Sequence, residues 1–412
     1  MRLPTHEATT AQLGAVYPLA ASRPLPSGGV LVGRDLLGGA FVHDPFELYA
    51  TGALTNPNMI VLGQIGRGKS ALVKTYLYRQ AAFGRRVVVL DPKGEYGPLA
   101  RALGTEPIAL RPGGALRLNP LDIASAGLSR EDAGQRRLAL CAAIASSALG
   151  RPLAPVEHTA VEIALDAAST SGAEPALPGV VDALLAPSAR AARLVGSDEA
   201  TLRADSRDLA LELRRLVHGE LRGMFDGPTS PGLALGGPAV VLDLAALYHS
   251  PALGVLVTCA AASVLAIVEA DVSVRTVLVV DEAWAVLANL GVARFLQSSW
   301  KLARARGIAN LAVVHRVSDL AAVGGAGSAA TRLAEGLIAD SETVVCYAQP
   351  AAGLPGLAAA LGLSDEEQRV VGGLRRGVAL WRVGCRSYLV EHRLAPGESH
   401  FVDTDARLVG VS

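Results

Sequence analysis

A glycine-rich stretch at residues 63–70 carries the clearest chemical signal in the sequence. It reads Gly-Gln-Ile-Gly-Arg-Gly-Lys-Ser, follows the apolar run 59–62 and precedes residues 71–83, which predict a helix. This matches the spacing G-x-x-x-x-G-K-[ST], and the strand before and helix after it are the context that the motif requires. Backbone N–H groups of such a loop surround an anion, and the helix N-terminus adds partial positive charge. The stretch therefore predicts a nucleoside triphosphate site, with a chance match of a glycine-rich turn as the alternative.

The residues of this loop have separate expected roles. Lys69 reaches the β- and γ-phosphates, and the hydroxyl of Ser70 binds Mg²⁺, so ATP and Mg²⁺ are the expected cofactors. Glycine lets the backbone approach phosphate where a Cβ would clash. We expect the cofactor site to be lined by Gly63, Gln64, Ile65, Gly66, Arg67, Gly68, Lys69, Ser70 and Ala71.

Two acids follow a later apolar run, residues 277–280, at Asp281 and Glu282. Seen alone, an apolar strand that ends in two acids is an ordinary surface feature. Downstream of a phosphate-binding loop, the same pattern predicts a second nucleotide motif. Asp281 would then lie near Mg²⁺, and Glu282 would orient or deprotonate the attacking water.

Other predicted strands also end in polar residues. Asp91, Lys93 and Glu95 follow the apolar run 87–90, and His315 follows another such run. The carboxyl ends of parallel strands face the ligand crevice in open α/β sheets, so these residues are site candidates. We assign Glu95 and His315 to the catalytic set, with His315 as a γ-phosphate sensor. A purely structural histidine is the alternative.

Two groups of arginines could reach the nucleotide of a neighbouring subunit. Arg304 and Arg306 lie in the last turn of a helix expected over residues 292–306, and Arg375 and Arg376 precede the last pair of predicted strands. An arginine finger stabilises the charge of the transferred phosphoryl group. Cations in a last helical turn also complement the helix dipole, and this reading stays open for Arg304 and Arg306. We take Arg304 and Arg376 as the finger candidates.

The composition indicates a large packed core. Of 412 residues, 50% are hydrophobic and 18% are charged, and the 38 basic and 38 acidic residues give a formal net charge of zero. Global charge therefore gives no argument for nucleic-acid binding, although a local basic pore stays open. The four cysteines are far apart without C-x-x-C spacing, which predicts buried thiols in a reducing cytosol.

No segment predicts secretion, and one needs weighing as a membrane span. The N-terminus lacks the apolar region of a signal peptide. Residues 251–268 carry no charge and are almost long enough to cross a bilayer. They lie between two predicted strands of a parallel sheet, so we expect a buried crossover helix and no direct membrane span.

Alternating strand and helix patterns predict an α/β fold with a mostly parallel sheet and an all-α insertion. We expect an N-terminal leader and β-hairpin over residues 1–57, and the core over residues 58–122 and 225–395. The insertion is expected over residues 123–224, and the tail over residues 396–412. Within the insertion, helical patterns are expected over residues 130–149, 156–168, 179–185 and 198–217. Its charges are interspersed and its apolar positions recur near helical spacing, which is typical of a packed bundle.

Four blocks resemble the HerA/FtsK superfamily of P-loop motors: residues 56–70, 91–96 (Asp-Pro-Lys-Gly-Glu-Tyr), 118–122 (Leu-Asn-Pro-Leu-Asp) and 279–284 (Val-Val-Asp-Glu-Ala-Trp). Within that group the chain looks most like the TraC-type ATPases of conjugative type IV secretion, in the shorter form of high-GC Gram-positive bacteria. The resemblance implies a RecA-like P-loop NTPase core, a homo-hexameric ring with ATP between subunits, and secretion-channel proteins as partners. It also implies a cytoplasmic place at the inner face of the cell membrane.

The resemblance has three departures. Family members often carry Gln where His315 stands, the larger secretion ATPases have a further N-terminal domain, and no FtsK-type DNA-reading domain is visible. The leading hypothesis is an ATPase motor of a secretion apparatus. One alternative is a DNA-translocating motor, which would need basic pore loops and salt-dependent binding. The other is an assembly module gated by ATP.

Overall fold

The computed structural model describes residues 24–402 apart from residues 27, 123–128, 170–173, 232, 234–235, 249, 251, 271–272, 288–289 and 317–328. The expected leader at residues 1–23, the start of the insertion at residues 123–128 and the end of the tail at residues 403–412 lie outside the described residues.

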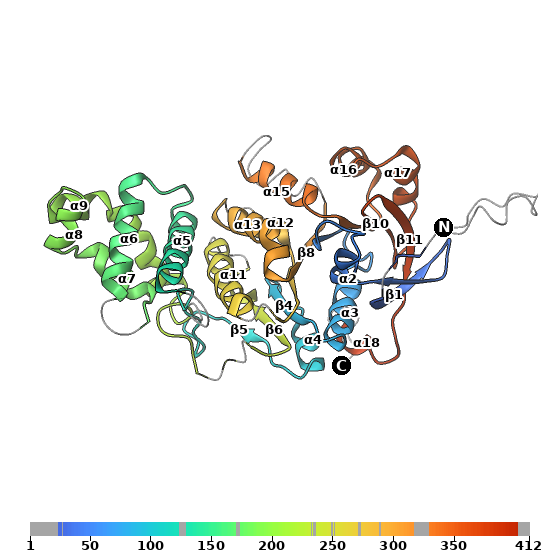
Figure 1. Ribbon diagram of the computed structural model, residues 1–412, viewed down its shortest axis with the longest axis horizontal. Coiled ribbons are helices and arrows are strands. Elements are labelled where there is room, and N and C mark those ends of the chain that lie inside the picture. The colour runs from blue at the N-terminus through green and yellow to red at the C-terminus, as the bar shows by residue number, and fades with distance from the viewer. Residues whose placement is uncertain are drawn as a thin grey trace, which may run out of the picture.

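An 11-stranded sheet runs through the described part of the chain, in the order β2-β1-β11-β10-β9-β3-β8-β7-β4-β6-β5 (Figure 1). From β9 to β5 the neighbouring strands are parallel, and from β2 to β9 they are antiparallel. The strands are β1 Val30–Asp35, β2 Ala40–His43, β3 Met59–Leu62, β4 Arg86–Asp91, β5 Ile108–Ala109, β6 Ala239–Asp243, β7 Thr276–Val280, β8 Ile308–Val314, β9 Thr343–Cys346, β10 Val378–Val383 and β11 Arg386–His392.

The central strands are buried on both faces, which explains why they read as continuous apolar runs. Successive side chains of β3 enter different cores: Ile60 belongs to one hydrophobic cluster and Val61 to the other. One cluster holds α3 (Lys69–Ala82), α4 (Gly97–Ala102) and α18 (Ser399–Val402) against the sheet. The other holds α11 and α13 against the opposite face. The sheet is therefore the middle layer of a three-layer core.

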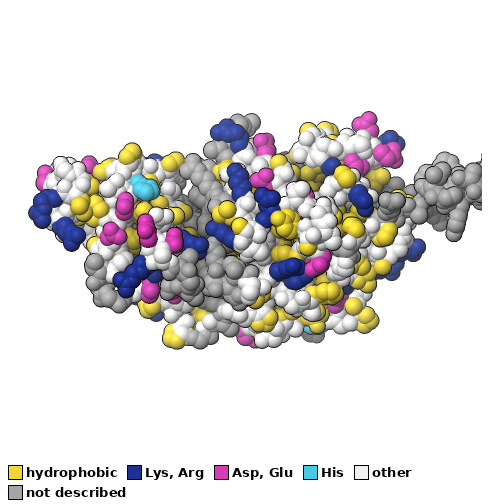
Figure 2. Space-filling model, in the orientation of Figure 1, with side chains coloured by type: hydrophobic (Ala, Val, Ile, Leu, Met, Phe, Trp, Pro, Cys, Tyr) yellow, Lys and Arg dark blue, Asp and Glu magenta, His cyan; other side chains and the backbone are white. Residues whose placement is uncertain are grey.

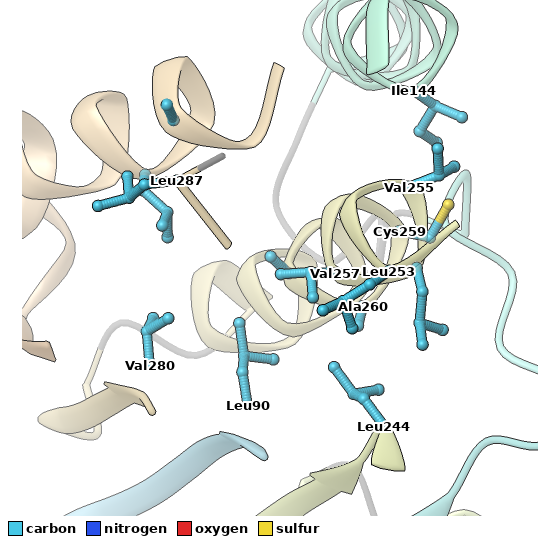
Figure 3. Close-up of a cluster of buried hydrophobic side chains, with 14 of the residues drawn as sticks. Leu90, Ile144, Leu244, Leu253, Val255, Val257, Cys259, Ala260, Val280 and Leu287 are labelled. Atoms are coloured by element: carbon cyan, nitrogen blue, oxygen red, sulfur yellow. The ribbon is translucent and has the colours of Figure 1, made fainter. Parts of the chain in front are cut away.

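The crossover helix expected between two parallel strands is α11, Leu253–Ala270, which connects β6 to β7. Its side chains pack against the sheet, where they meet Leu90 of β4, Val280 of β7 and Leu244, which follows β6 (Figure 3). The prediction of a buried helix is confirmed. Among the described helices, none combines the length and apolar character that crossing a bilayer requires.

The helices between β5 and β6 form a separate lobe, seen in green at one end of Figure 1. This lobe meets the core where α5 packs against α11 and α13. Acidic and basic side chains are interspersed over the visible face of its α6–α9 end (Figure 2). The helices are α5 Arg130–Leu149, α6 Pro155–Ser169, α7 Leu177–Leu185, α8 Ala189–Leu194, α9 Glu199–Asp205 and α10 Arg207–Arg215, with a π-turn at Leu216–Glu220.

The prediction of one continuous helix over residues 198–217, in the last part of this lobe, is wrong. The structure breaks it at Ser206, which ends α9 and precedes α10 with φ −98° and ψ 5°. The Ser206 hydroxyl donates to the carbonyl of Leu202, and a hydroxyl that bonds backwards in this way competes with regular helix geometry. The pattern also did not predict α8.

The remaining helices flank the antiparallel end of the sheet and the connections of the core. They are α2 Pro45–Ala50, α12 Ala283–Leu287, α13 Leu290–Arg306, α15 Ala329–Ala339, α16 Leu354–Leu361 and α17 Asp365–Gly372, with 3₁₀ turns at Ala245–Leu247 and Ala351–Gly353. The β-hairpin expected after residue 28 is confirmed as β1 and β2.

Two further expectations need correction. The segment taken as an uninformative tail contains α18, whose Phe401 is buried beside Tyr78 of α3, and Glu398 pairs with Arg79 at 2.5 Å. Of the four cysteines, Cys385 is exposed, because it lies in the turn between β10 and β11. The other three thiols are buried as predicted.

Candidate nucleotide-binding and active site

The glycine-rich loop joins β3 to the N-terminus of α3, as its motif requires. Gly66 and Gly68 have φ of 77° and 110°, in the region that side chains with a Cβ rarely adopt. A Cβ at Gly63 would lie 2.4 Å from Cβ of Tyr347, so close packing under the loop also demands glycine there. Gly377 N donates to the carbonyl of Arg67 at 3.0 Å and fixes the far side of the loop.

Lys69, only 5% exposed, lies inside this loop. Its ammonium donates to the carbonyl oxygen of Gly63 and, at 3.0 Å, to that of Gln64. The charge is therefore held within the cradle by neutral acceptors. Phosphate oxygens make stronger, charge-assisted hydrogen bonds with an ammonium than carbonyl groups do. The arrangement suits an anionic ligand whose oxygens replace these carbonyls as acceptors for the Lys69 ammonium.

Strand order brings the predicted site residues to one edge of the sheet, which we call the carboxyl edge. The register pairs Leu62 with Val314 and Val280 with Ala312, so β3, β8 and β7 end close together. β8 lies between the other two and is followed by His315. The loop 63–70 and the acids Asp281 and Glu282 therefore lie at the same edge of the sheet, as a shared ligand requires.

Glu282 is the most constrained residue of this edge. It is 4% exposed and has φ of 50°, a left-handed conformation that strains a residue with a side chain. Its Oε1 accepts from Lys93 Nζ and from His315 Nε2, the latter at 2.8 Å, and its Oε2 accepts from Trp284 Nε1. The carboxylate is thus held by three donors from different parts of the chain.

The surroundings shift the pKa values of the two neighbouring acids in opposite directions. Burial raises the pKa of Asp281 to about 6, and the charge of Glu282 adds to that rise. Burial also opposes ionisation of Glu282, but hydrogen bonds from His315 and Lys93 outweigh it and lower the pKa of Glu282 to about 2. Asp281 is consequently a buried acid without enough positive charge around it, which favours a bound cation.

Comparison with known proteins agrees with this geometry. Residues 50–124 match the family model of an AAA-like domain. The chain is similar to VirB4 of Thermoanaerobacter pseudethanolicus, with 22% sequence identity and a TM-score of 0.74, over 92% of this chain and 100% of that one. The chain has a RecA-like P-loop NTPase fold. A comparison with the curated proteins finds no match.

Two solved structures of the plasmid coupling protein TrwB share this P-loop NTPase fold. TrwB with the non-hydrolysable ATP analogue ADPNP has 17% identity and a TM-score of 0.55, over 82% of this chain and 85% of that one. TrwB with ADP and Mg²⁺ has 16% identity and a TM-score of 0.54, over 95% of each chain.

The donor set at this edge fits Mg²⁺ in the manner of P-loop NTPases. Such a site uses the loop hydroxyl, here Ser70, and one carboxylate, here Asp281, and leaves the remaining positions to phosphate and water. Within the described part of the chain there is no group of three or more His, Cys, Asp or Glu that could hold a metal ion. A Mg²⁺ ion held by Ser70 and Asp281 would take its remaining ligands from the nucleotide and water.

The residues after β4 divide into structural and chemical ones. Asp91 is fully buried, and its carboxylate accepts from the backbone N–H groups of Lys93, Gly94 and Tyr96 at 3.2, 2.8 and 2.8 Å. These three bonds hold the shape of the turn. Lys93 instead reaches across to Glu282. Glu95 is half-buried, and its charge contributes to the raised pKa of Asp281.

The two arginine-finger candidates lie at opposite edges of the sheet. Gly307, just after α13, accepts from Thr276 N at 3.0 Å, so Arg304 lies near the start of β7, away from the P-loop of its own subunit. Arg376 is exposed and directly precedes Gly377, which hydrogen-bonds to the P-loop. The finger role of each stays a prediction.

The catalytic set predicted from sequence omitted three contacts of this P-loop NTPase site. Trp284 holds Glu282, Tyr347 packs beneath Gly63, and Gln349 donates to the carbonyl of His315 at 3.1 Å. Tyr347 and Gln349 follow β9, whose place beside β3 was not predicted. Trp284 is two residues after Glu282 and lies in the recognised block 279–284, so its position was the one available signal.

Proposed function

We propose that this chain is the ATP-hydrolysing motor of a conjugation or type IV secretion apparatus, working as a homo-hexameric ring with ATP between subunits. The observation that supports this most strongly is the meeting of the P-loop, Asp281, Glu282 and His315 at one edge of a fold shared with the whole of the VirB4 structure. The resemblance of four sequence blocks to TraC-type ATPases supports the same function, as does the shared fold of TrwB, a conjugative coupling protein.

The proposed mechanism assigns one task to each group at the carboxyl edge. The N–H groups of the P-loop and the Lys69 ammonium bind the β- and γ-phosphates and neutralise charge that develops on them. Ser70 and Asp281 would hold Mg²⁺, which when bound would offset the negative charge of the phosphates. Glu282 accepts a hydrogen bond from the attacking water and orients it toward the γ-phosphorus.

His315 connects the water-orienting carboxylate to the nucleotide in this proposal. Its Nε2–H donates to Glu282, and within the described part of the chain its buried Nδ1 has no hydrogen-bond partner. β8 lies between the P-loop strand and the strand of Asp281, and we propose that this nitrogen is the group that senses the γ-phosphate. Loss of that phosphate would change the hydrogen bonding of both groups.

The decisive experiment measures ATP binding and hydrolysis by the wild type and by Lys69→Ala, on protein of determined ring size. The wild type is expected to bind and hydrolyse ATP, and Lys69→Ala is expected to lose ATP binding. Lys301→Ala is the matched control, because Lys301 is exposed on α13. Unchanged nucleotide affinity in Lys69→Ala would defeat the site, and a monomer with full activity would defeat the ring.

The arginine fingers are tested by mixing subunits. Arg304→Ala or Arg376→Ala is expected to lower the rate by about 10³-fold if that arginine is the finger, since a finger is worth at least this much. If the arginine acts in trans, ATPase activity recovers in rings mixed with Lys69→Ala subunits. The arginine variant then supplies an intact P-loop, and the Lys69→Ala neighbour supplies the intact arginine. No recovery for either arginine would remove both from the finger role.

The same preparation distinguishes the motor from a DNA translocase. ATPase rates are measured with and without duplex DNA over a range of salt concentrations. A rate that DNA does not change supports the secretion motor. Stimulation that falls steeply with salt would instead show phosphate contacts and replace the proposal with a DNA motor.

A further inference from the structure

The contact between Lys93 and Glu282 joins residues far apart in the sequence at the centre of the candidate site. The Lys93 ammonium bonds Oε1 of Glu282, and the side chain of Lys93 is 29% exposed whereas that of Glu282 is 4% exposed. Lys93 takes no part in the proposed binding of phosphate or Mg²⁺. Its side-chain ammonium is instead directed at the residue proposed to orient water.

The backbone that carries Lys93 is rigidly held, although its ammonium is partly in solvent. The turn after β4 is closed by three N–H bonds to the buried carboxylate of Asp91. Gly94 has φ of 73°, and a Cβ there would lie 3.1 Å from Asp243 Oδ1 and from Ala245 Cβ. The turn is therefore packed against β6 and its extension. Only the four-carbon stem of Lys93 has freedom to move, so its ammonium can exchange partners without any backbone change.

Occupancy of the Glu282 carboxylate limits what it can do in this conformation. Each carboxylate oxygen has two lone pairs. Those of Oε1 are taken by Lys93 and His315, and Oε2 already accepts from Trp284. A water that approaches Oε1 of Glu282 must therefore compete with an ammonium, which is the stronger donor because it is charged. Release of Lys93 frees one lone pair on Oε1 without disturbing the His315 contact.

We propose that Lys93 is a latch that holds Glu282 in a resting orientation, and that the γ-phosphate of bound ATP draws the ammonium away. This inference rests on the proposed ATPase function. The γ-phosphate is a competing acceptor with more negative charge than one carboxylate. Lys93 pairs with Glu282, which is the residue proposed to orient water toward that phosphate. Nucleotide without a γ-phosphate leaves the latch closed, so the latch couples water activation to the presence of hydrolysable substrate. Lys93 is a positioning residue in this scheme.

Trp284 provides a readout that is independent of turnover. Its indole N–H donates to Oε2 of the same carboxylate, so movement of Glu282 changes the environment of the indole. The chain has three tryptophans, and Trp300 and Trp381 are buried at 2% and 1% exposure. Protein labelled with 5-fluorotryptophan should give three fluorine NMR signals, and Trp284→Phe identifies the one that belongs to residue 284.

The experiment compares wild type, Lys93→Met, Lys93→Arg and the control Lys301→Met, which makes the same change at an exposed lysine of α13. We expect kcat of Lys93→Met to rise by about threefold or more, the scale of a partly exposed ion pair, with KM unchanged. We expect its nucleotide-free Trp284 signal to match that of the wild type with ADPNP. ADP should leave the wild-type signal in place, and Lys93→Arg should restore the resting signal.

Two results would overturn the latch. The first is a tenfold or greater fall in kcat of Lys93→Met, which would make Lys93 a group that the reaction needs. The second is a Trp284 signal that changes neither in Lys93→Met nor with ADPNP, which would mean that Glu282 does not move. Failure of the proposed function is a different result, namely wild type that binds ATP without hydrolysing it. The Trp284 signal still tests the latch in that case, because it needs only nucleotide binding.

Discussion

Two polar clusters lie at opposite edges of the same parallel strands, and their hydrogen bonding differs. At the carboxyl edge, Glu282 is surrounded by Lys93, His315 and Trp284. At the amino edge, Asn58 precedes β3 and is 1% exposed. Its Nδ2 donates to the carbonyls of Trp300 and Asp340 at 3.1 and 3.3 Å, and its Oδ1 accepts from Asn310 Nδ2 at 2.9 Å.

The difference separates a structural polar cluster from one suited to chemistry. Asn58 is neutral, and both donors of its amide and its oxygen are satisfied, so a ligand gains nothing by entering there. Glu282 carries charge and a strained backbone, and the His315 beside it has a buried ring nitrogen without a partner in the described part of the chain. The strained backbone of Glu282 and this ring nitrogen thus lie together at the edge where a nucleotide would supply a partner.

The strongest test of this contrast is Glu282→Gln. We expect at least an ~100-fold fall in kcat, the scale for loss of a general base, because the amide cannot accept the water proton. ATP binding should stay close to wild type, whereas the unfolding temperature should fall, because an amide NH₂ replaces an oxygen that accepts from a donor. Steady-state kinetics and thermal unfolding measure the two effects. Full turnover would remove the water-orienting role from Glu282, and a slow variant that still supports function would favour the assembly module over the motor.

Asp281→Asn tests the electrostatic cost of the carboxyl edge. Because the folded-state pKa of Asp281 is raised to about 6 from 3.8, the unfolded state loses this proton first as pH rises. Stability is therefore lost between about pH 4 and pH 6, and the loss persists above that window. We expect Asp281→Asn to stabilise nucleotide-free protein by up to about 3 kcal/mol near pH 8, with no gain near pH 4. Equal effects at both pH values in denaturant titrations would contradict this assignment.

Asn58→Ala tests the amino edge and should have the opposite profile. It removes an acceptor from the side-chain amide of Asn310 and a donor from the carbonyls of Trp300 and Asp340, at a cost of about 2 kcal/mol of unfolding free energy. The kcat and KM of the folded protein should be unchanged. Asn56→Ala is the control, because Asn56 gives Asn58 a single contact, an acceptor for its backbone N–H at 3.0 Å, and should cost less. A selective loss of turnover in Asn58→Ala would remove the distinction between the two edges.

Much of the fold and some of the site follow from local sequence patterns. The limits of β3 and α5 agree with the sequence prediction to the residue, because an all-apolar run and a serine cap with a glycine end define them locally. The break at Ser206 and the exposure of Cys385 did not follow, since both depend on what packs against the segment. Helices α15 to α17 carry no site motif and were not predicted.

The sequence by itself determined the phosphate loop, the acids Asp281 and Glu282 and the strands that carry them, because backbone conformation and burial follow from neighbouring residue types. Only the tertiary structure decided which of these residues touch. Lys93 meets Glu282 because β4 pairs with β7, and Arg376 lies beside the P-loop because the turn before β10 bonds to it. Strand order depends on how the whole chain covers its sheet, and no local pattern contains that information.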